Sequence, residues 1–168
     1  MKFPCPKCGQ PTRAVKPITL RSLLSEKSRA RVASYDGFRF CPTTNCALLY
    51  VQPQANLVFG SDAVIVPVFQ KSTEATRPVC YCFHHSAREI HREAALAGVS
   101  QIVQSIAEKC RQGEDRCEET NPQGSCCLGN VRAVLHRARS ERGLEQASQE
   151  PASETSCCHS PRKEDKPE

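Results

Sequence analysis

Apolar residues in the first half of the chain form short, well-separated groups. Between residues 19 and 32 they recur at helical spacing among basic residues, which predicts an amphipathic helix of about three turns. From residue 47 onward the pattern changes to short runs of β-forming residues, separated by polar turns. These runs predict a small antiparallel sheet and comprise residues 47–51, 57–59 and 64–69. The helix should bury Leu20, Leu23, Leu24 and Ala30.

The second half of the chain predicts three helices with clear start and stop signals. Ser86 and Glu89 have the spacing of a capping box, so the first helix should begin after Ser86 and end at Gly98. Ser100 should cap the second helix, and residues 126–127 should open the third. Their predicted apolar faces are Ile90, Ala94 and Ala97, then Ile102, Val103 and Ile106, then Leu128, Val131, Val134 and Leu135.

A polar, unpatterned segment at residues 70–78 separates these two patterns. A chain of 168 residues is long enough for one ordinary domain or two small ones. We therefore predict an α+β protein, with a first module of one short antiparallel sheet and one helix over residues 1–75. A helical module should follow over residues 76–139. Residues 140–168 are rich in Ser, Glu and Pro, which predicts a disordered tail.

Twelve cysteines in a chain of this length need a chemical explanation. The N-terminus has no apolar stretch of signal-peptide length, and the longest strongly apolar run, residues 63–69, is too short to span a bilayer. We therefore expect a cytoplasmic protein with no membrane insertion. Because thiols stay reduced in that compartment, metal ligation explains the cysteines better than disulfides do.

The net charge of +5 is concentrated near the N-terminus, where residues 1–40 hold nine Lys or Arg against two acidic residues. Clustered cations suit phosphate contacts, so a nucleic-acid surface is one interpretation. Surfaces that engage single strands also use aromatic residues for stacking, and this chain has only six Phe, three Tyr and no Trp. We therefore favour a solvated face, or one that steers an acidic protein partner.

Two pairs of cysteines in the first module have the spacing of a metal site. Cys5 and Cys8 form a C-x2-C knuckle followed by Gly9, which relieves the backbone where it folds under a metal. Cys41 and Cys46 supply the second pair. Four thiolates select zinc or iron, and such a site replaces a core that so short a segment could not build. The first module should therefore be zinc-ribbon-like.

Cys80 and Cys82 form a second kind of pair. Alternate residues of an extended backbone point to opposite sides, so both thiols cannot enter an apolar core, but both can reach a metal group wrapped by a turn. Their partners should be Cys117 and one of the adjacent Cys126 and Cys127, where a helix start favours thiolates. Such a set can hold either a zinc ion or a [2Fe–2S] cluster, and the spacing leaves both open.

Cys110 is the chief rival of Cys117, because it also lies between the two halves of this set. Its place on the apolar face of its helix indicates a buried thiol, and the turn at residues 121–124 favours Cys117, the nearer cysteine. His84 and His85 could ligate or tune a cluster, but with four thiols present we expect them to face solvent. The sequence contains no acid–base pair, activated nucleophile or nucleotide motif.

Several of these strings also occur together in a known family. They are Cys5-Pro6-Lys7-Cys8, residues 19–24, residues 38–42 with Cys46, Cys80-Tyr81-Cys82-Phe83 and residues 121–129. In this order and with these gaps, they resemble the N-terminal domain of CopZ-type copper chaperones over residues 3–136. The part that carries the second set is itself similar to the bacterioferritin-associated ferredoxin family.

The resemblance implies one zinc ion, which would only hold the first module together, and one [2Fe–2S] cluster associated with redox chemistry, including reduction of cupric to cuprous ion. By motif position the zinc ligands would be Cys5, Cys8, Cys41 and Cys46. The cluster ligands would be Cys80, Cys82, Cys117 and one of Cys126 and Cys127, of which we prefer Cys127.

The full chaperones continue into a ferredoxin-like copper-binding domain with a Met-x-Cys-x-x-Cys loop, for which this sequence has no counterpart. We expect an electron-transfer or metal-redox module linked to copper handling, which would be an enzyme only through its cluster. Its partners would be a copper ion or copper-binding protein and a redox donor protein. Two alternatives stay open: a metallochaperone or storage module without redox work, and an all-zinc protein that docks on nucleic acid. For Cys157-Cys158-His159 in the tail, we favour an exposed dithiol without function over capture of a soft metal ion.

Overall fold

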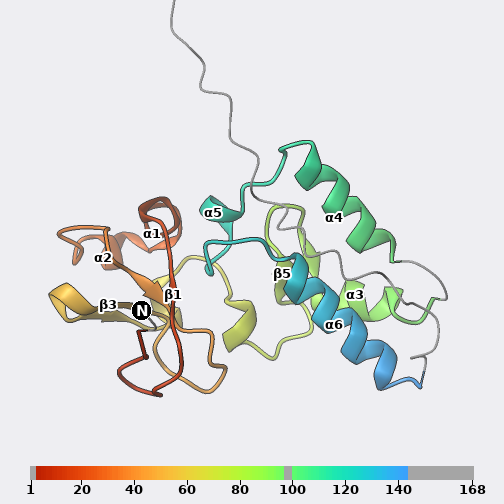
Figure 1. The fold of residues 1–168 in the computed structure, drawn as a ribbon, viewed down its shortest axis with the longest axis horizontal. Coiled ribbons are helices and arrows are strands. Elements are labelled where there is room, and N and C mark those ends of the chain that lie inside the picture. The colour runs from red at the N-terminus through yellow and green to blue at the C-terminus, as the bar shows by residue number, and fades with distance from the viewer. Residues whose placement is uncertain (1–2, 97–99, 144–168) are drawn as a thin grey trace, which may run out of the picture.

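The computed structural model describes residues 3–96 and 100–143. Most of the predicted disordered tail, with its Cys157-Cys158-His159 motif, and the predicted helix end at Gly98 therefore lie outside the described residues. The described chain has two apolar cores, one in the half that contains the main sheet and one among the longer helices (Figure 1).

Four short strands form an antiparallel sheet in the order β1-β2-β3-β4. They are β1 (Arg13–Ala14), β2 (Arg39–Phe40), β3 (Tyr50–Gln52) and β4 (Leu57–Phe59). Phe40 pairs with Tyr50 and Tyr50 pairs with Phe59, so three buried aromatic residues align across the sheet. Together with the helices described below, this sheet confirms the predicted α+β class.

The predicted strand at residues 64–69 is wrong. Within this run, which the structure describes in full, Val64 alone pairs, in an isolated bridge with Leu24. The chain then enters a 3-10 turn at Phe69–Lys71. Strands β1 and β2, which the hydrophobic pattern did not predict, complete the sheet instead. Two further 3-10 turns span Pro53–Ala55 and Ser61–Ala63.

The single helix predicted over residues 19–32 is in fact two helices, α1 (Pro17–Leu23) and α2 (Glu26–Arg29). The break lies at Leu24, whose extended backbone forms the bridge to the 64–69 run. Ser25 then caps α2 with its hydroxyl. Of the four residues predicted to be buried, Leu20, Leu23 and Leu24 are buried and Ala30 is exposed.

The second core is built from helices around a two-stranded ribbon. Its elements are β5 (Pro78–Cys80), β6 (His85–Ser86), α3 (Ala87–Glu93), α4 (Gln101–Arg111), α5 (Cys117–Thr120) and α6 (Leu128–Ser140). The predicted apolar faces of α4 and α6 pack in this core, with Ile102 only partly buried. Cys117 begins α5, which contacts α1 between the two cores (Figure 1). The module boundary at residue 75 stays a prediction.

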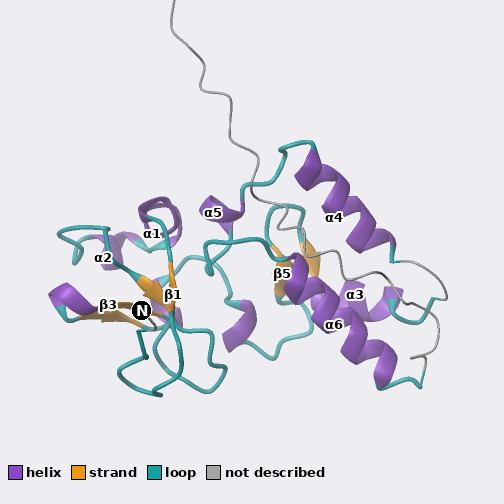
Figure 2. Cartoon of the chain, viewed as in Figure 1, coloured by secondary structure: helices purple, strands orange, loops and turns teal. Residues whose placement is uncertain are grey.

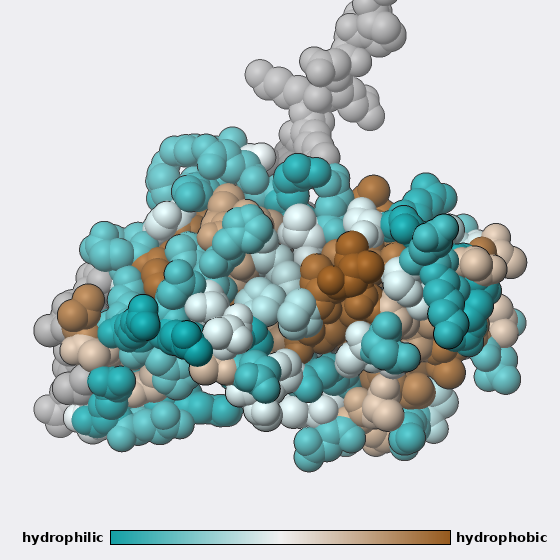
Figure 3. All heavy atoms as spheres, turned by 180° about the vertical axis from the view of Figure 1, so that it is seen from behind, coloured by the Kyte–Doolittle hydropathy of each residue, from teal (hydrophilic) through white to brown (hydrophobic). Residues whose placement is uncertain are grey.

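Loops make up much of the chain that connects the two cores (Figure 2). Seen from behind, the surface is mostly polar, with a large apolar area near the middle of the view and smaller ones elsewhere (Figure 3). None of the described helices is long and apolar enough to cross a membrane. In the basic first half, the guanidinium groups of Arg21, Arg31 and Arg39 lie over aromatic rings at 4.7–5.2 Å from the ring centroids. Rings covered in this way are less available for stacking on bases.

Ser86→Ala should lower the free energy of unfolding by about 1 kcal/mol, because it removes a helix cap. The Ser86 hydroxyl accepts the backbone N–H of Glu89 at 3.3 Å, and the Glu89 carboxylate accepts the backbone N–H of Ser86 at 2.7 Å. These hydrogen bonds lower the pKa of Glu89. The cap therefore stabilises the fold above the ordinary pKa of Glu, and this contribution is lost as the pH falls through the lowered, folded-state pKa.

Urea denaturation of the wild-type protein and of Ser86→Ala measures the loss of stability. Repeating it at neutral and at acidic pH measures how that loss depends on pH. Ser105→Ala, in the interior of α4, is the control and should not destabilise, because Ala is the better helix former. An equal loss of stability in the two variants would contradict the role of the cap.

Candidate metal centres

The four cysteines predicted for the first site bring their sulfur atoms within 4.8 Å of one another: Cys5, Cys8, Cys41 and Cys46. At the knuckle, Gly9 has a φ of 70° and donates its N–H to the Cys5 carbonyl at 2.9 Å. The Cys5–Cys46 and Cys8–Cys41 sulfur separations are 3.8 and 3.7 Å. Thiolates about 2.3 Å from a tetrahedral zinc ion lie about 3.8 Å apart. The set therefore matches the geometry of a single tetrahedral ion.

The thiols of the first set differ in pKa. The pKa of Cys8 is lowered to about 6, because its sulfur is hydrogen-bonded to the Thr43 hydroxyl and to the Gln10 backbone. Burial raises the pKa of Cys41, and it raises the pKa of Cys46 to about 12. Since zinc binds thiolates, metal binding must release protons from the buried members of the set.

The second set is assembled from three elements. Cys80 ends β5, Cys82 follows in the turn to β6, Cys117 begins α5, and Cys127 stands directly before α6. The sulfur atoms of Cys82 and Cys117 are 3.5 Å apart, and the Cys127 sulfur is hydrogen-bonded to both Cys117 and Cys80. The structure therefore brings together the four cysteines that the sequence analysis preferred. They form a chain of sulfur contacts in the order Cys82, Cys117, Cys127, Cys80.

Two of these sulfurs favour the thiolate form. Hydrogen bonds with Cys117 and Cys80 lower the pKa of Cys127 to about 4. The hydrogen bond with Cys127, together with burial, raises the pKa of Cys80. The pKa of Cys82 is lowered to about 7, first by the Cys117 thiol and then by the Thr120 hydroxyl and the backbone N–H of Arg116.

Exposure distinguishes Cys82 from the other members of the second set. Cys80, Cys117 and Cys127 are all at most 3% exposed, whereas Cys82 is only half-buried. His84, directly after the pair in the turn, is exposed and has a φ of 57°. A metal group held by this set would therefore be shielded from water on the side of three ligands and accessible beside Cys82.

The two rival cysteines occupy different surroundings. Cys110 is 5% exposed and packs in the helical core, as its position on the apolar face predicted. Cys126 is half-buried, and its sulfur accepts the N–H of Leu128 at 3.5 Å. Its charge would raise the pKa of Cys127, so the two adjacent thiols oppose each other's ionisation.

Sequence analysis missed the hydroxyl residues that contact the thiols. Thr43 lies inside the C-x4-C loop, and Thr120 lies three residues after Cys117, with its hydroxyl 3.3 Å from the Cys82 sulfur. The position of Thr43 between two candidate ligands was a usable signal. Thr120 was not detectable, because its contact with Cys82 spans 38 residues.

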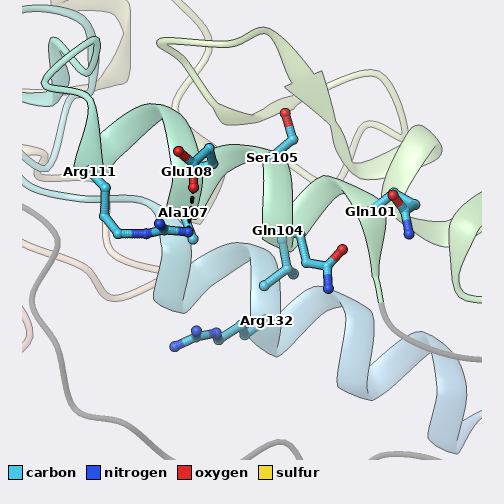
Figure 4. Close-up of a pocket in the computed structure, with 8 residues that line it drawn as sticks. Gln101, Gln104, Ser105, Ala107, Glu108, Arg111 and Arg132 are labelled. Carbon is cyan, nitrogen blue, oxygen red and sulfur yellow. Dashed lines mark ion pairs between the residues drawn. The ribbon is translucent and has the colours of Figure 1, made fainter.

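A hollow of 460 Å³ lies between α4 and α6 (Figure 4). Among the described residues that line it are Gln101, Gln104 and Arg132, and none of them is a cysteine or a histidine. Glu108 and Arg111 form an ion pair at its edge. The hollow is thus not lined by any member of the two cysteine sets.

Comparison with known proteins supports a relationship in sequence and in structure. Residues 2–65 match the zf_CopZ family, described as a zinc-binding domain, and this region contains the whole first set. The fold is similar to the X-ray structure of the Archaeoglobus fulgidus CopZ N-terminal domain, with a TM-score of 0.65 and 26% sequence identity. The alignment covers 79% of this chain and 97% of that one.

The chain is therefore similar to a zinc-binding family over residues 2–65 and to a CopZ N-terminal domain in its fold. The four cysteines of the first set all lie within this matching region, and their arrangement is suited to hold one metal ion. A search of the curated proteins finds no match. The second set lies beyond the residues that match the zinc-binding family, so the match itself assigns no metal to that set.

Cys41→Ala should reduce the zinc content from about one ion per chain to near zero and lower the unfolding temperature, because four thiolates complete the tetrahedral site. Elemental analysis and thermal unfolding measure the two effects. Cys110→Ala is the matched control, since it also removes a buried thiol but should retain the zinc. Full zinc content in Cys41→Ala would contradict the assignment.

Proposed function

We propose that the protein is a two-centre metal protein that transfers single electrons in copper handling. In this proposal Cys5, Cys8, Cys41 and Cys46 hold zinc, and Cys80, Cys82, Cys117 and Cys127 hold a [2Fe–2S] cluster. The observation that carries the proposal is the chain of sulfur contacts in the second set, in which three thiols are buried and Cys82 reaches the surface. When bound, the cluster would supply one electron at a time, which is what reduction of a cupric to a cuprous ion consumes.

The donor set fits an iron–sulfur cluster better than a single ion. Within the described part of the chain, the first set is the one whose sulfur atoms all lie within 4.8 Å of one another. The second set forms a longer chain instead, in which Cys82 lies next to Cys117, and Cys127 is hydrogen-bonded to both Cys117 and Cys80. Two irons, each needing two terminal thiolates, suit four sulfurs that are spread along such a chain better than one ion does.

The residues around Cys82 are suited to stabilise added negative charge. The backbone N–H of Arg116 donates to the Cys82 sulfur at 3.3 Å, and the Thr120 hydroxyl lies at the same distance. Hydrogen bonds to a ligand sulfur stabilise the more negative state of an iron–sulfur group and therefore raise its reduction potential. An electron would leave or enter beside Cys82, the most exposed of the four cysteines.

The partners that suit this site are a copper ion or copper-binding protein as electron acceptor and a redox protein as donor. The relationship to a CopZ domain supports copper handling as the setting. None of the ten described cysteines forms a disulfide, which agrees with a cytoplasmic location.

Protein purified without oxygen should contain about two irons and one zinc per chain and show visible absorption that dithionite bleaches. Elemental analysis and an optical spectrum test this prediction. A colourless protein that holds zinc alone would overturn the proposal and favour an all-zinc protein.

The ligand assignment is tested with the same two measurements on single variants. Cys82→Ala, Cys117→Ala and Cys127→Ala should each lose the visible absorption, because each removes one member of the sulfur chain. Cys110→Ala and Cys126→Ala are the matched controls and should retain it. Loss of colour in either control would require a different ligand set.

The reduced protein, freed of dithionite, should convert about one cupric ion to cuprous ion per cluster, because a [2Fe–2S] cluster stores one electron. A chromophoric cuprous chelator added under nitrogen measures the product, and the returning cluster absorption measures the electron lost. Cys117→Ala treated in the same way provides the background from free thiols. Equal yields from the two proteins would show that thiols, and not the cluster, reduce copper.

A further inference from the structure

The segment that carries Cys117 and Cys127 is held in place by the opposite half of the protein. We name residues 117–127 the ligand loop. The Tyr50 hydroxyl donates to the carbonyl of Pro122 at 2.6 Å, and the Thr19 hydroxyl donates to the carbonyl of Glu118 at 2.6 Å. Tyr50 lies on β3 and Thr19 on α1, so both donors belong to the half that contains the first cysteine set.

The two donor side chains are buried, whereas a third contact that accompanies them lies at the surface. Tyr50 and Thr19 are both 0% exposed. Burial raises the pKa of Tyr50 well above its ordinary value, so the phenol stays protonated and remains a donor at any physiological pH. A buried carbonyl that loses its donor costs more than a surface one. The ion pair of Lys16 with Glu118 is largely exposed and adds little.

The turn within the ligand loop is fitted closely against the same half. Gly124 has a φ of 65°, and a Cβ at this position would lie 3.0 Å from the Thr19 hydroxyl oxygen and 3.2 Å from a Val15 methyl carbon. The Gln70 amide donates to Gln123 at 2.8 Å, and the Gln123 amide in turn donates to the carbonyl of Cys126 at 2.8 Å. The loop is therefore fixed from α5 to the residue before Cys127.

Both groups of contacts lead back to the first cysteine set. Cys41 donates its N–H to the carbonyl of Leu49 at 2.8 Å, and Leu49 precedes Tyr50 in the chain. Lys71, the neighbour of Gln70, donates to the carbonyls of Thr43 and Cys46. Two short series of hydrogen bonds and peptide bonds thus connect one cysteine set with the ligand loop of the other. Figure 1 shows α5 at the junction between the two halves.

We propose that Tyr50 and Thr19 are positioning residues for the second centre, so that zinc in the first site sets how firmly the ligand loop is held. Zinc would fix the loop between Cys41 and Cys46. Through Leu49 this loop holds Tyr50, which holds Pro122. Through Lys71 it holds Gln70, which holds Gln123. Loss of zinc would therefore loosen Cys117 and Cys127 without touching either residue. The identity of the second metal group rests on the proposed function, whereas the restraint on the loop does not.

The first test uses zinc-loaded protein without a cluster and measures backbone hydrogen exchange in residues 117–127. Tyr50→Phe and Thr19→Val should each speed this exchange by about fivefold, the factor expected for loss of one net hydrogen bond. Zinc content should be unchanged in both. Tyr35→Phe is the matched control, since it makes the same chemical change at a half-buried position under Arg21 and should leave the loop unaffected.

The second test removes zinc from the wild-type protein with a chelator. Exchange in residues 117–127 should rise more than exchange in α6, because α6 is held by its own core. Two results would overturn the proposal. In one, the ligand loop exchanges equally fast in Tyr50→Phe and Tyr35→Phe. In the other, the ligand loop of the zinc-free wild-type protein stays protected.

In protein that contains the cluster, Tyr50→Phe should release iron to a chelator faster than Tyr35→Phe and show a shifted reduction potential. If Tyr50→Phe only destabilised the first half of the protein, the variant would lose zinc first. If Tyr50 positions the ligand loop, the reduction potential of the cluster would change while the zinc content stays full. If no cluster forms in any variant, the proposed function fails while the exchange measurements still decide the positioning role. Equal potentials and equal iron release in the two variants would overturn the extension to the cluster.

Discussion

Each cysteine site joins segments that lie far apart along the chain, and closing those loops is the constraint that the rest of the fold satisfies. Cys5 meets Cys46 across 41 residues, and Cys82 meets Cys117 across 35. Closing such loops costs conformational entropy, and contacts between thiols recover little of it. Two separate apolar cores supply the remaining free energy, one on each side of the ligand loop. Metal binding would then add stability to sites that the cores have already assembled.

A second constraint is electrostatic, because several thiolates in a buried place repel one another. Each set resolves this by holding some sulfurs protonated and letting their hydrogens stabilise a neighbouring thiolate. In the second set the bond between Cys80 and Cys127 raises the pKa of one and lowers the pKa of the other. Ionising all four thiols requires a compensating cation, so both sets favour a multiply charged metal group.

The parts of the fold that the sequence predicted are those with local causes. The Ser86–Glu89 capping box, the Ser100 cap and the apolar faces of α4 and α6 depend on residues within one or two turns, and the structure confirms them. The errors have non-local causes. The helix broke at Leu24 because the Ser25 N–H donates to the carbonyl of Ala63, which no helical pattern encodes.

The same distinction applies to the two candidate sites. The cysteine pairs were detectable because their spacings are short, and the four preferred members of the second set do come together. Strand β1 was not predicted, because both of its residues are exposed and show no alternation. The contact of Tyr50 with Pro122 spans 72 residues and joins two ordinary-looking positions, so only the folded chain reveals it.

Cys117 shows why neither core alone can complete the second set. It begins α5, a helix of four residues, and isolated helices shorter than about 12 residues are marginal in water. Cys80 belongs to a strand that packs in the helical core, and Cys127 stands at the start of the 13-residue α6. The contact that fixes α5 comes instead from α1, where the Thr19 hydroxyl donates to the carbonyl of Glu118. The polar segment at residues 70–78 therefore marks a change in sequence pattern but not a break in the hydrogen-bond network. Gln70 and Lys71, at its start, connect the two cysteine sets.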